Sequence, residues 1–242
     1  MPHAASSKPV SDTQGIMLCC SLFPAFSHLP RSELQDISSR FRTRRYRAQE
    51  TILQSRESSD QVYFIASGSV RTRMASPFGK EIYYQDLHAG EMFGELSAID
   101  GLPRTTDVAA IEDTTVLLTE KRDFIALLDS YPALAHATLE KLAHLVRFLC
   151  DRVYQYSALD VSSRVRAELI SLAESRGRQV DQHIVIDKMP THQDLANMLA
   201  THREAVTREL GFLEKQGIVV KQKHHFTILD MHRLKALLLP IR

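Results

Sequence analysis

The feature that most constrains how this chain folds is an uninterrupted helical segment in its middle. Residues 133–158 contain no glycine and no proline, and their apolar residues recur at alternating spacings of four and three. These seam residues are Ala135, Leu139, Leu142, Val146, Leu149, Val153 and Tyr156. A seam sustained for about three heptads is typical of a helix that pairs with another helix. We therefore expect a homodimer through residues 135–156, with packing inside a single chain as the alternative.

The region before this helix consists of short apolar segments separated by glycine, serine or charged residues. Between Phe41 and about Thr119 these segments are residues 51–53, 62–65, 69–74, 81–84 and 114–118. A spacing of roughly 8–12 residues favours an antiparallel sandwich or barrel, and a β-roll fits best. Gly68 and residues 76–79 are the turn signals. A short helix is predicted over residues 121–131, ended by Pro132.

A glycine-rich stretch from Gly90 to Thr106 lies among these segments and carries one arginine, Arg104. It is predicted to form a strand end, a short helix and a tight return. Free N–H groups at such a helix start can cradle an anion, and Arg104 would supply the countercharge. Because Glu95 repels phosphate, we expect it to accept a hydrogen bond from a sugar hydroxyl of the same ligand. The stretch predicts a nucleotide site without a Walker lysine, and a simple Glu95–Arg104 salt bridge is the alternative.

After a predicted hinge at residues 157–160, the pattern changes again. Residues 161–174 are predicted to be helical and residues 184–186 to form a strand. A capping-box pattern at residues 191–194 opens one helix, and a tight turn at 200–201 leads to a second, from about 202 to 216. Gly217 is its stop, and residues 218–220 and 226–229 form a β-hairpin. This order indicates a winged helix-turn-helix.

The second of these helices carries side chains suited to reading base pairs. An arginine can hold guanine O6 and N7 through two hydrogen bonds, and a glutamate can accept one from cytosine N4. Arg203, Glu204 and Arg208 are the candidates, with Val206, Leu210 and Leu213 on the buried side. The hairpin would contact phosphates through Lys221, Lys223, His224 and His225. Alternatively, Glu204 belongs to a capping box with Thr201.

These motifs carry a resemblance to a known family. Residues 93–96 together with residues 103–106 resemble the phosphate-binding cassette of cyclic-nucleotide-binding domains. Residues 159–165, 191–196 and 202–208 resemble the hinge and helix-turn-helix of the catabolite-activator (CRP/FNR) family of transcription regulators. The resemblance extends over about residues 20–230, and cassette, long helix, hinge and helix-turn-helix follow in the expected order.

The resemblance implies a role for each matching residue. Glu95 would bind the ribose 2′-hydroxyl, and Arg104 and Thr105 would hold the cyclic phosphate. The candidate set for the cyclic nucleotide is Phe93, Gly94, Glu95, Leu96, Arg104, Thr105, Leu149 and Cys150. The candidate set for double-stranded DNA, at a palindromic TGTGA-like site, is Thr191, His192, Gln193, His202, Arg203, Glu204, Thr207, Arg208, Lys221 and Lys223.

Two positions depart from the family pattern. The cyclic-AMP-activated member recognises adenine through two adjacent hydroxyl residues of the long helix, where this chain has Leu149 and Cys150. Leucine cannot hydrogen-bond a base edge and a thiol does so weakly, so cyclic AMP and cyclic GMP both stay open as effectors. His202 stands where the family commonly has a capping serine. A regulator of the same fold that is constitutive, or that answers another small-molecule or redox signal, is the alternative.

Composition excludes several other classes. With a net charge of +1 across 242 residues, DNA binding has to come from a local patch. No apolar run approaches the ~20 residues that span a bilayer. Three cysteines build no disulfide framework, which predicts a cytoplasmic protein, and Cys19 and Cys20 are too few for an iron–sulfur cluster. Motifs for metal binding or catalysis are missing, so no metal and no enzymatic activity are expected; an enzyme or binding module without a DNA role is the remaining alternative.

The sequence thus predicts an α+β chain with an antiparallel β-roll, a long dimerisation helix and a winged helix-turn-helix. The expected limits are a flexible tail at 1–20, the roll at 21–131, the helix at 132–159 and the DNA-binding domain at 160–242. RNA polymerase is the expected further partner, with the surface loop Glu174–Asp181 as the candidate contact.

Overall fold

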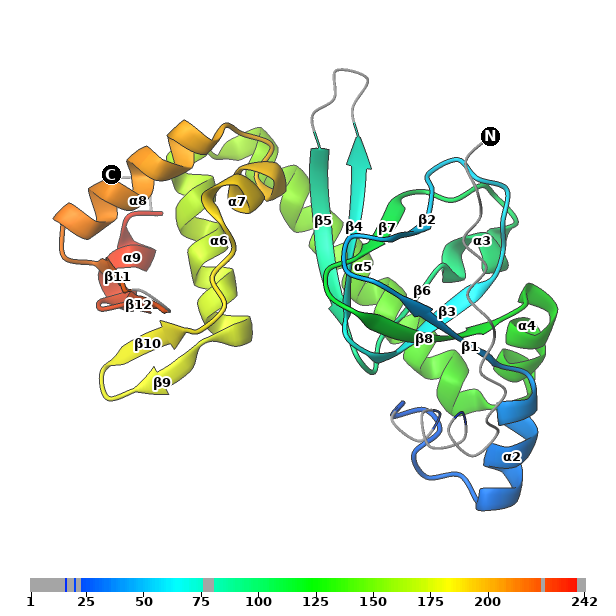
Figure 1. The fold of residues 1–242 in the computed structure, drawn as a ribbon. Helices are drawn as coiled ribbons and strands as arrows, with labels where there is room; N and C mark the ends of the chain where they lie inside the picture. The colour runs from blue at the N-terminus through cyan, green and yellow to red at the C-terminus, as the bar shows by residue number, and fades with distance from the viewer. Residues whose placement is uncertain (1–15, 17–19, 21–22, 76–80, 223–224, 239–242) are drawn as a thin grey trace. The chain divides into compact units, whose positions relative to one another are not determined.

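The computed structural model describes residues 16, 20, 23–75, 81–222 and 225–238 of the chain. The chain divides into two compact units (Figure 1). The N-terminal unit comprises residues 1–76 and 83–144, and the C-terminal unit comprises residues 77–82 and 145–242. The predicted fold class is confirmed, and the predicted domain limits stay a prediction. Predictions for Cys19, the turn at 76–79, Lys223 and His224 lie outside the described residues.

The N-terminal unit contains two four-stranded sheets, ordered β1-β8-β3-β6 and β2-β7-β4-β5. In the first, β8 pairs antiparallel with both β1 and β3; in the second, β7 pairs antiparallel with both β2 and β4. The strands are β1 (Arg42–Tyr46), β2 (Thr51–Leu53), β3 (Val62–Ser67), β4 (Ser69–Ala75), β5 (Glu81–His88), β6 (Met92–Phe93), β7 (Asp107–Ala110) and β8 (Thr114–Thr119). All five predicted strands are present, β6 is the strand end predicted within residues 90–106, and β1 and β7 are additions.

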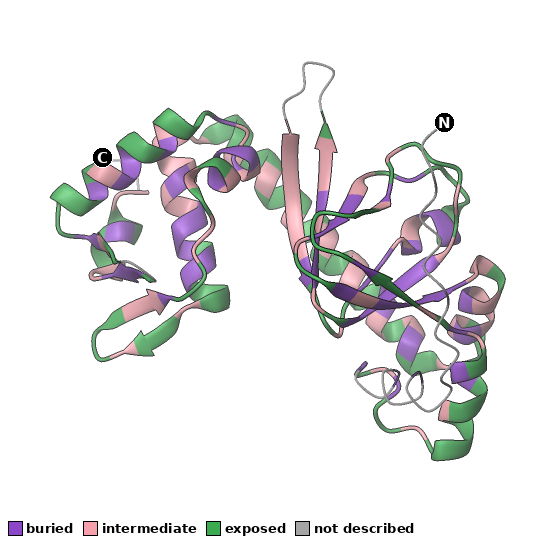
Figure 2. Cartoon of the chain, viewed as in Figure 1, coloured by how far each residue is buried: buried purple, intermediate pink, exposed green. Residues whose placement is uncertain are grey.

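A cluster of buried side chains, several of them aromatic, packs helices against the strands of the roll. Buried residues are purple in Figure 2. Phe64 of β3 is the centre, with the rings of Phe23 and Phe41 each 5.2 Å away, edge to face. Phe124 of α4 (Lys121–Ser130) and Ile37 of α2 (Arg31–Ser39) are fully buried in the same cluster. Ile16 and Cys20, which fall in the predicted tail, are also buried there.

The long helix α5 spans Pro132–Ala158, as the heptad pattern predicts. Pro132 is its first residue, because a missing backbone N–H is harmless in the first turn of a helix. Leu134 and Thr138 are buried within the N-terminal unit. The seam is open in the single chain: Leu139, Val146 and Val153 are 64%, 60% and 65% exposed. The homodimer stays a prediction that this open seam supports.

In the described residues, the C-terminal unit packs four helices and a four-stranded sheet around one apolar core. Its helices are α6 (Val161–Arg176), α7 (His192–Met198), α8 (Arg203–Lys215) and the short, unpredicted α9 (Met231–Ala236). Its strands, in the order β11-β12-β10-β9, are β9 (Arg178–Val180), β10 (His183–Ile186), β11 (Val219–Lys221) and β12 (Phe226–Ile228). Val165, Leu195 and Val206 are among its fully buried side chains. The helix-turn-helix is α7 and α8, and the wing is the β11–β12 hairpin.

One predicted loop is wrong. Residues 174–181 are not an open loop, because they contain the last turn of α6 and the whole of β9. Gly177 separates the two, and a Cβ there would lie 2.2 Å from the carbonyl oxygen of Ala173. Only glycine lets the chain leave α6 this tightly, and β9 then pairs with β10.

Candidate functional sites

The cassette (residues 93–106) is built on a backbone turn that needs glycine. Gly94 has a φ of 83° and lies directly before α3 (Glu95–Asp100). A Cβ at this position would be 2.8 Å from Arg104 Nη1 and 2.9 Å from the carbonyl oxygen of Gln61. The absence of a side chain therefore lets α3, β3 and the Arg104 loop come together.

Arg104 is a buried guanidinium that joins three segments of the roll. It is only 4% exposed, and its Nε, Nη1 and Nη2 donate to Ser59 Oγ at 2.8 Å, to the Gly94 carbonyl at 2.7 Å and to the Gln61 carbonyl at 2.7 Å. Burial lowers the pKa of Arg104, while nearby Tyr63 and Glu57 act in the opposite direction. Because a guanidinium has five N–H donors, it still has donors for an anion.

Glu95 is buried too, and its ionic partner is not Arg104, with which the sequence analysis had paired it as the alternative. Its carboxylate is 4% exposed and lies 2.7 Å from Nζ of Lys141, on α5. Lys141 also donates to the Met92 carbonyl at 2.6 Å. The alternative of a simple Glu95–Arg104 salt bridge is therefore wrong. Lys141 was missed, although it follows Leu134 and Thr138 on the same edge of α5, where a lysine is out of place unless it has a buried partner.

The other predicted cassette residues lie around these two charges. Phe93 is buried and its ring stacks on that of Tyr63, with centroids 5.0 Å apart. Leu96 is half-buried in the first turn of α3, and Thr105 is exposed, with its carbonyl accepting a hydrogen bond from Ser55 Oγ. Leu149 and Cys150 are exposed on the part of α5 that belongs to the C-terminal unit. Their role in a ligand site stays a prediction.

The helix-turn-helix begins with the predicted capping box. Thr191 Oγ1 accepts the Asp194 N–H at 3.1 Å, and Asp194 Oδ2 accepts the Thr191 N–H at 3.2 Å. The tight turn places Ala200 at a φ of 50°. His202 is the N-cap residue of α8 and makes no side-chain cap, so the alternative capping box between Thr201 and Glu204 is wrong. Glu204 is exposed instead.

The start of α8 presents the predicted base-reading residues on one side. Arg203, Glu204, Thr207 and Arg208 are all exposed and together line a shallow hollow of about 340 Å³. On the opposite side of the helix Val206 and Leu213 are fully buried, as predicted. Arg203 and Arg208 therefore have the freedom to contact a ligand without disturbing the core.

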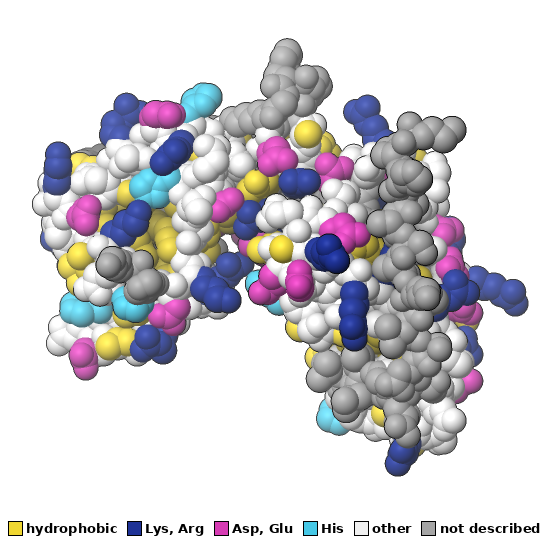
Figure 3. All heavy atoms as spheres, in the orientation of Figure 1, with side chains coloured by type: hydrophobic (Ala, Val, Ile, Leu, Met, Phe, Trp, Pro, Cys, Tyr) yellow, Lys and Arg dark blue, Asp and Glu magenta, His cyan; other side chains and the backbone are white. Residues whose placement is uncertain are grey.

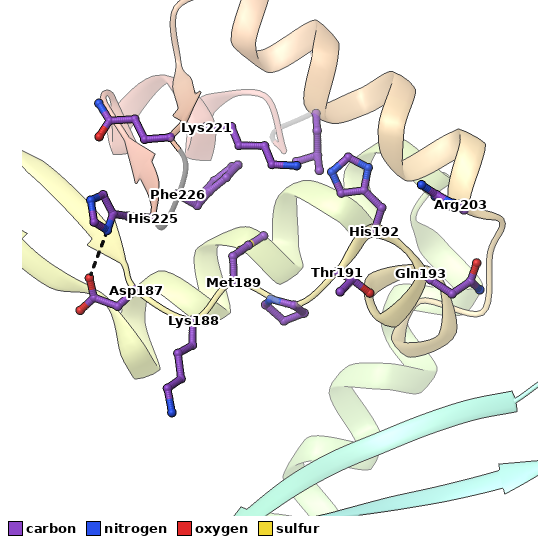
Figure 4. A pocket seen from close by; sticks show the side chains of 13 residues that line it. Asp187, Lys188, Met189, Thr191, His192, Gln193, Arg203, Lys221, His225 and Phe226 are labelled. Atoms are coloured by element: carbon purple, nitrogen blue, oxygen red, sulfur yellow. Dashed lines mark ion pairs between the residues drawn. The ribbon is translucent and has the colours of Figure 1, made fainter. Parts of the chain in front are cut away.

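A larger groove of about 600 Å³ lies between the segment before α7, helix α8 and the wing (Figure 4). Met189, Leu210 and Phe226 give it apolar walls. In the space-filling view this apolar surface has lysine, arginine and histidine side chains around it (Figure 3). The groove collects the predicted residues Thr191, His192, Gln193, Arg203 and Lys221. It also contains Asp187 and Lys188, which the sequence did not single out.

His192 is held in this groove by a chain of two hydrogen bonds. Its Nδ1 lies 2.8 Å from Thr207 Oγ1, and that hydroxyl donates to the Arg203 carbonyl at 2.9 Å. Because the hydroxyl has only one hydrogen, Nδ1 of His192 is the donor in the first bond. Burial, with the positive charges of Lys221 and Arg203, lowers the pKa of His192.

The end of α5 is fixed to the helix-turn-helix by contacts that the sequence did not reveal. Arg152 forms a 2.8 Å ion pair with Glu168 of α6. The Tyr156 hydroxyl donates to the Met198 carbonyl at 2.9 Å, and Arg164 lies over the Tyr156 ring. Asp160 caps α6 by accepting the Ser163 N–H at 2.7 Å, a bond that lowers the pKa of Asp160. The predicted hinge is thus a short connection with hydrogen bonds and an ion pair beside it.

Histidine, cysteine, aspartate and glutamate side chains form no group of three that could hold a metal ion in the described part of the chain. None of the helices described is both long enough and apolar enough to cross a bilayer.

Comparisons with known proteins agree with this geometry. Residues 43–131 match the model of the cyclic nucleotide-binding domain, and residues 163–237 match that of the Crp-like helix-turn-helix domain. The chain is 30% identical over 196 residues to a cyclic AMP receptor protein of Thermus thermophilus, covering 81% of this chain and 88% of the relative. It is 26% identical to a CRP-like cAMP-activated global transcriptional regulator of Mycobacterium tuberculosis, with 76% and 82% covered.

A solved structure shows the same fold. A variant of CooA from Carboxydothermus hydrogenoformans superposes with a TM-score of 0.80 at 24% identity, and the match covers 90% of this chain and 95% of that one. The order of roll, long helix and winged helix-turn-helix is therefore shared along nearly the full length of both chains.

Proposed function

This chain belongs to the catabolite-activator (CRP/FNR) family of transcription regulators, and from that premise we propose that a cyclic nucleotide bound in the β-roll controls its affinity for DNA. The observation that carries the proposal is the pair of buried opposite charges, Glu95 and Arg104, at the two ends of the cassette. Burying charges is expensive unless they are used or paired. Arg104 retains donors for a cyclic phosphate, and Glu95 Oε1 is available to accept a hydrogen bond from a ribose 2′-hydroxyl.

Cyclic AMP and cyclic GMP are both proposed effectors. The relatives described above are named for cyclic AMP, which favours that nucleotide. Leu149 and Cys150 offer a base edge little hydrogen bonding, and each neutral hydrogen bond contributes only about 0.5–1.5 kcal/mol. Discrimination between the two bases is therefore expected to be weak.

The working form is a homodimer on DNA. Pairing of the open α5 seam from two copies would bury Leu139, Val146 and Val153. Two copies of α8 then enter successive major grooves about 34 Å apart, at a palindromic TGTGA-like site. RNA polymerase is the proposed further partner, in the cytoplasm, with the α6 end and β9 as the surface offered to it.

The first test is Arg104→Ala, with Arg45→Ala on the exposed face of β1 as the matched control. Removing Arg104 takes away the countercharge for the phosphate, so titration calorimetry should show cyclic-nucleotide binding lost in this variant and kept in the control. In the wild type, ligand at 100-fold over its Kd should stabilise the fold by about 2.7 kcal/mol in a thermal shift. Unchanged affinity in Arg104→Ala would remove Arg104 from the site.

A constitutive regulator, or one that answers another signal, is the second candidate. The exposed Leu149 and Cys150 favour it, because neither is suited to reading a base. A gel-shift titration separates the two candidates. Equal operator affinity with and without cyclic AMP or cyclic GMP would support the constitutive regulator.

A further inference from the structure

In the groove between α8 and the wing, the imidazole of His192 lies near two cations, Lys221 and Arg203. In Figure 4 the Lys221 side chain extends toward His192, and Arg203 lies on the other side of the ring. Nδ1 of His192 is occupied by Thr207, as shown above. Nε2 is then the nitrogen that can take up a proton and donate to an acceptor entering the groove.

Charged groups line this groove from every element packed around His192. The segment before α7 contributes Asp187 and Lys188, α8 contributes Arg203, and the wing contributes Lys221 and His225. Glu214 of α8 lines a smaller hollow that also contains His192, and Asp194 lies two residues further along α7. Asp194 is held in the capping box, and Asp187 lies within 4 Å of Arg178 and His225. Burial and the positive charges of Lys221 and Arg203 lower the pKa of His192 in the free protein.

A DNA phosphate would reverse this electrostatic balance. Its oxygens would neutralise Lys221 and Arg203 and place negative charge beside the imidazole, which favours the protonated ring. A protonated His192 can hold Thr207 with one N–H and a phosphate oxygen with the other, and charge-assisted bonds of this kind are the stronger ones. No comparable gain is available to a neutral imidazole, whose Nε2 has no hydrogen to give.

We propose that His192 takes up a proton when the groove receives a DNA phosphate, so that the affinity for DNA rises as pH falls. The proposal rests on the proposed DNA-binding function and adds a proton to it. The sign follows from linkage: the complex binds the proton more tightly than the free protein does. The gain in DNA affinity begins as pH falls through the pKa that His192 has in the complex. It is complete once pH is below the pKa that His192 has in the free protein.

The test is binding of a fluorescent palindromic duplex with TGTGA half-sites, measured by anisotropy between about pH 8 and about pH 6 at fixed ionic strength. The wild type should bind more tightly at lower pH, by at most about tenfold per pH unit for each His192 engaged. His192→Gln should bind as weakly as the wild type does at high pH, with that part of the pH dependence lost. His192→Arg, which is always charged, should bind tightly at every pH.

His183→Gln is the matched control, because His183 is exposed on β10 and its Nδ1 contacts the Leu229 carbonyl outside the groove. It should keep the wild-type pH dependence. Calorimetry in buffers of different ionisation enthalpy gives a second readout, since proton uptake by the wild type should vanish in His192→Gln. The proposal is overturned if His192→Gln keeps the wild-type pH dependence of DNA affinity. It is also overturned if the wild type binds the duplex tightly with an affinity that does not change with pH. If no variant binds any duplex at any pH, even at low salt, the DNA-binding function fails instead.

Discussion

At the scale of single residues, the cassette depends on two buried charges that are held in different ways. Arg104 donates to two backbone carbonyls and one hydroxyl, whereas Glu95 depends on the ammonium of Lys141 from another element. A carboxylate that is 4% exposed loses its compensation entirely when its one ionic partner is removed. The stability of the roll should therefore be sensitive to Lys141.

The prediction is that Lys141→Met destabilises the protein by roughly 3–5 kcal/mol at neutral pH, because it leaves a buried charge unpaired. Urea unfolding measures the loss. Lys235→Met is the control, since Lys235 pairs with Glu174 at the same 2.7 Å but both side chains are more than half exposed, so about 0–1 kcal/mol is expected. Combining Lys141→Met with Glu95→Gln should recover most of the loss. Equal effects of the two lysine variants would show that burial does not strengthen the Glu95 pair.

The sequence identified Glu95 and Arg104 because glycine, proline and charge stand at fixed offsets within one short stretch. It could not identify Lys141, whose contact depends on how α5 packs against the roll. The hydrogen bond of Tyr156 to the Met198 carbonyl was hidden for the same reason, since Tyr156 also fits the seam. A motif within one short stretch can be recognised from the sequence, whereas a side-chain contact between elements far apart in the sequence cannot.

At the scale of elements, segments with a clear period or a capping motif were predictable, and two strands without such a pattern were missed. The heptad pattern predicted both ends of α5 to within one residue, and the capping-box pattern predicted the start of α7. Strand β1, in contrast, has one buried residue among five and four polar ones, because it lies at the edge of its sheet and pairs on one side only. Strand β7 was missed as well, because its four residues include three buried in succession and show no alternation.

The seam itself gives a prediction for α5. Val146→Asp should dissociate the dimer, because it places a carboxylate in the middle of an apolar interface. His144→Asp, an exposed position of the same helix outside the seam, is the control and should stay dimeric. Sedimentation gives the mass and anisotropy the affinity for the palindrome, which should fall only for Val146→Asp. A wild type that is monomeric at micromolar concentration contradicts the dimer.

At the scale of the whole molecule, α5 belongs to both units. Its first half contributes Lys141 to the cassette, and its last turns contribute Arg152 and Tyr156 to the contacts with α6 and α7. An effector that altered the Glu95–Lys141 pair would therefore act on α5, the same helix whose last turns contact α6 and α7. Coupling between two sites through such an element is a free energy that both ligands share.

The corresponding prediction is reciprocal linkage. If cyclic nucleotide tightens DNA binding by some factor, saturating operator DNA has to tighten nucleotide binding by the same factor. Calorimetry of the nucleotide, with and without the palindrome, measures one side, and anisotropy with and without the nucleotide measures the other. Arg152→Met, which breaks the ion pair with Glu168, should reduce both factors together. A change in one factor alone would point to a second nucleotide site.

The bonds of Arg104 have a consequence for ligand recognition. Its guanidinium ties together Ser59, Gln61 and Gly94 using contacts internal to the protein. These hydrogen bonds hold the cassette turn in place without a ligand. If the proposed cyclic nucleotide binds at this turn, we expect little ordering of loops to accompany its binding. The conformational entropy that binding costs would then be small.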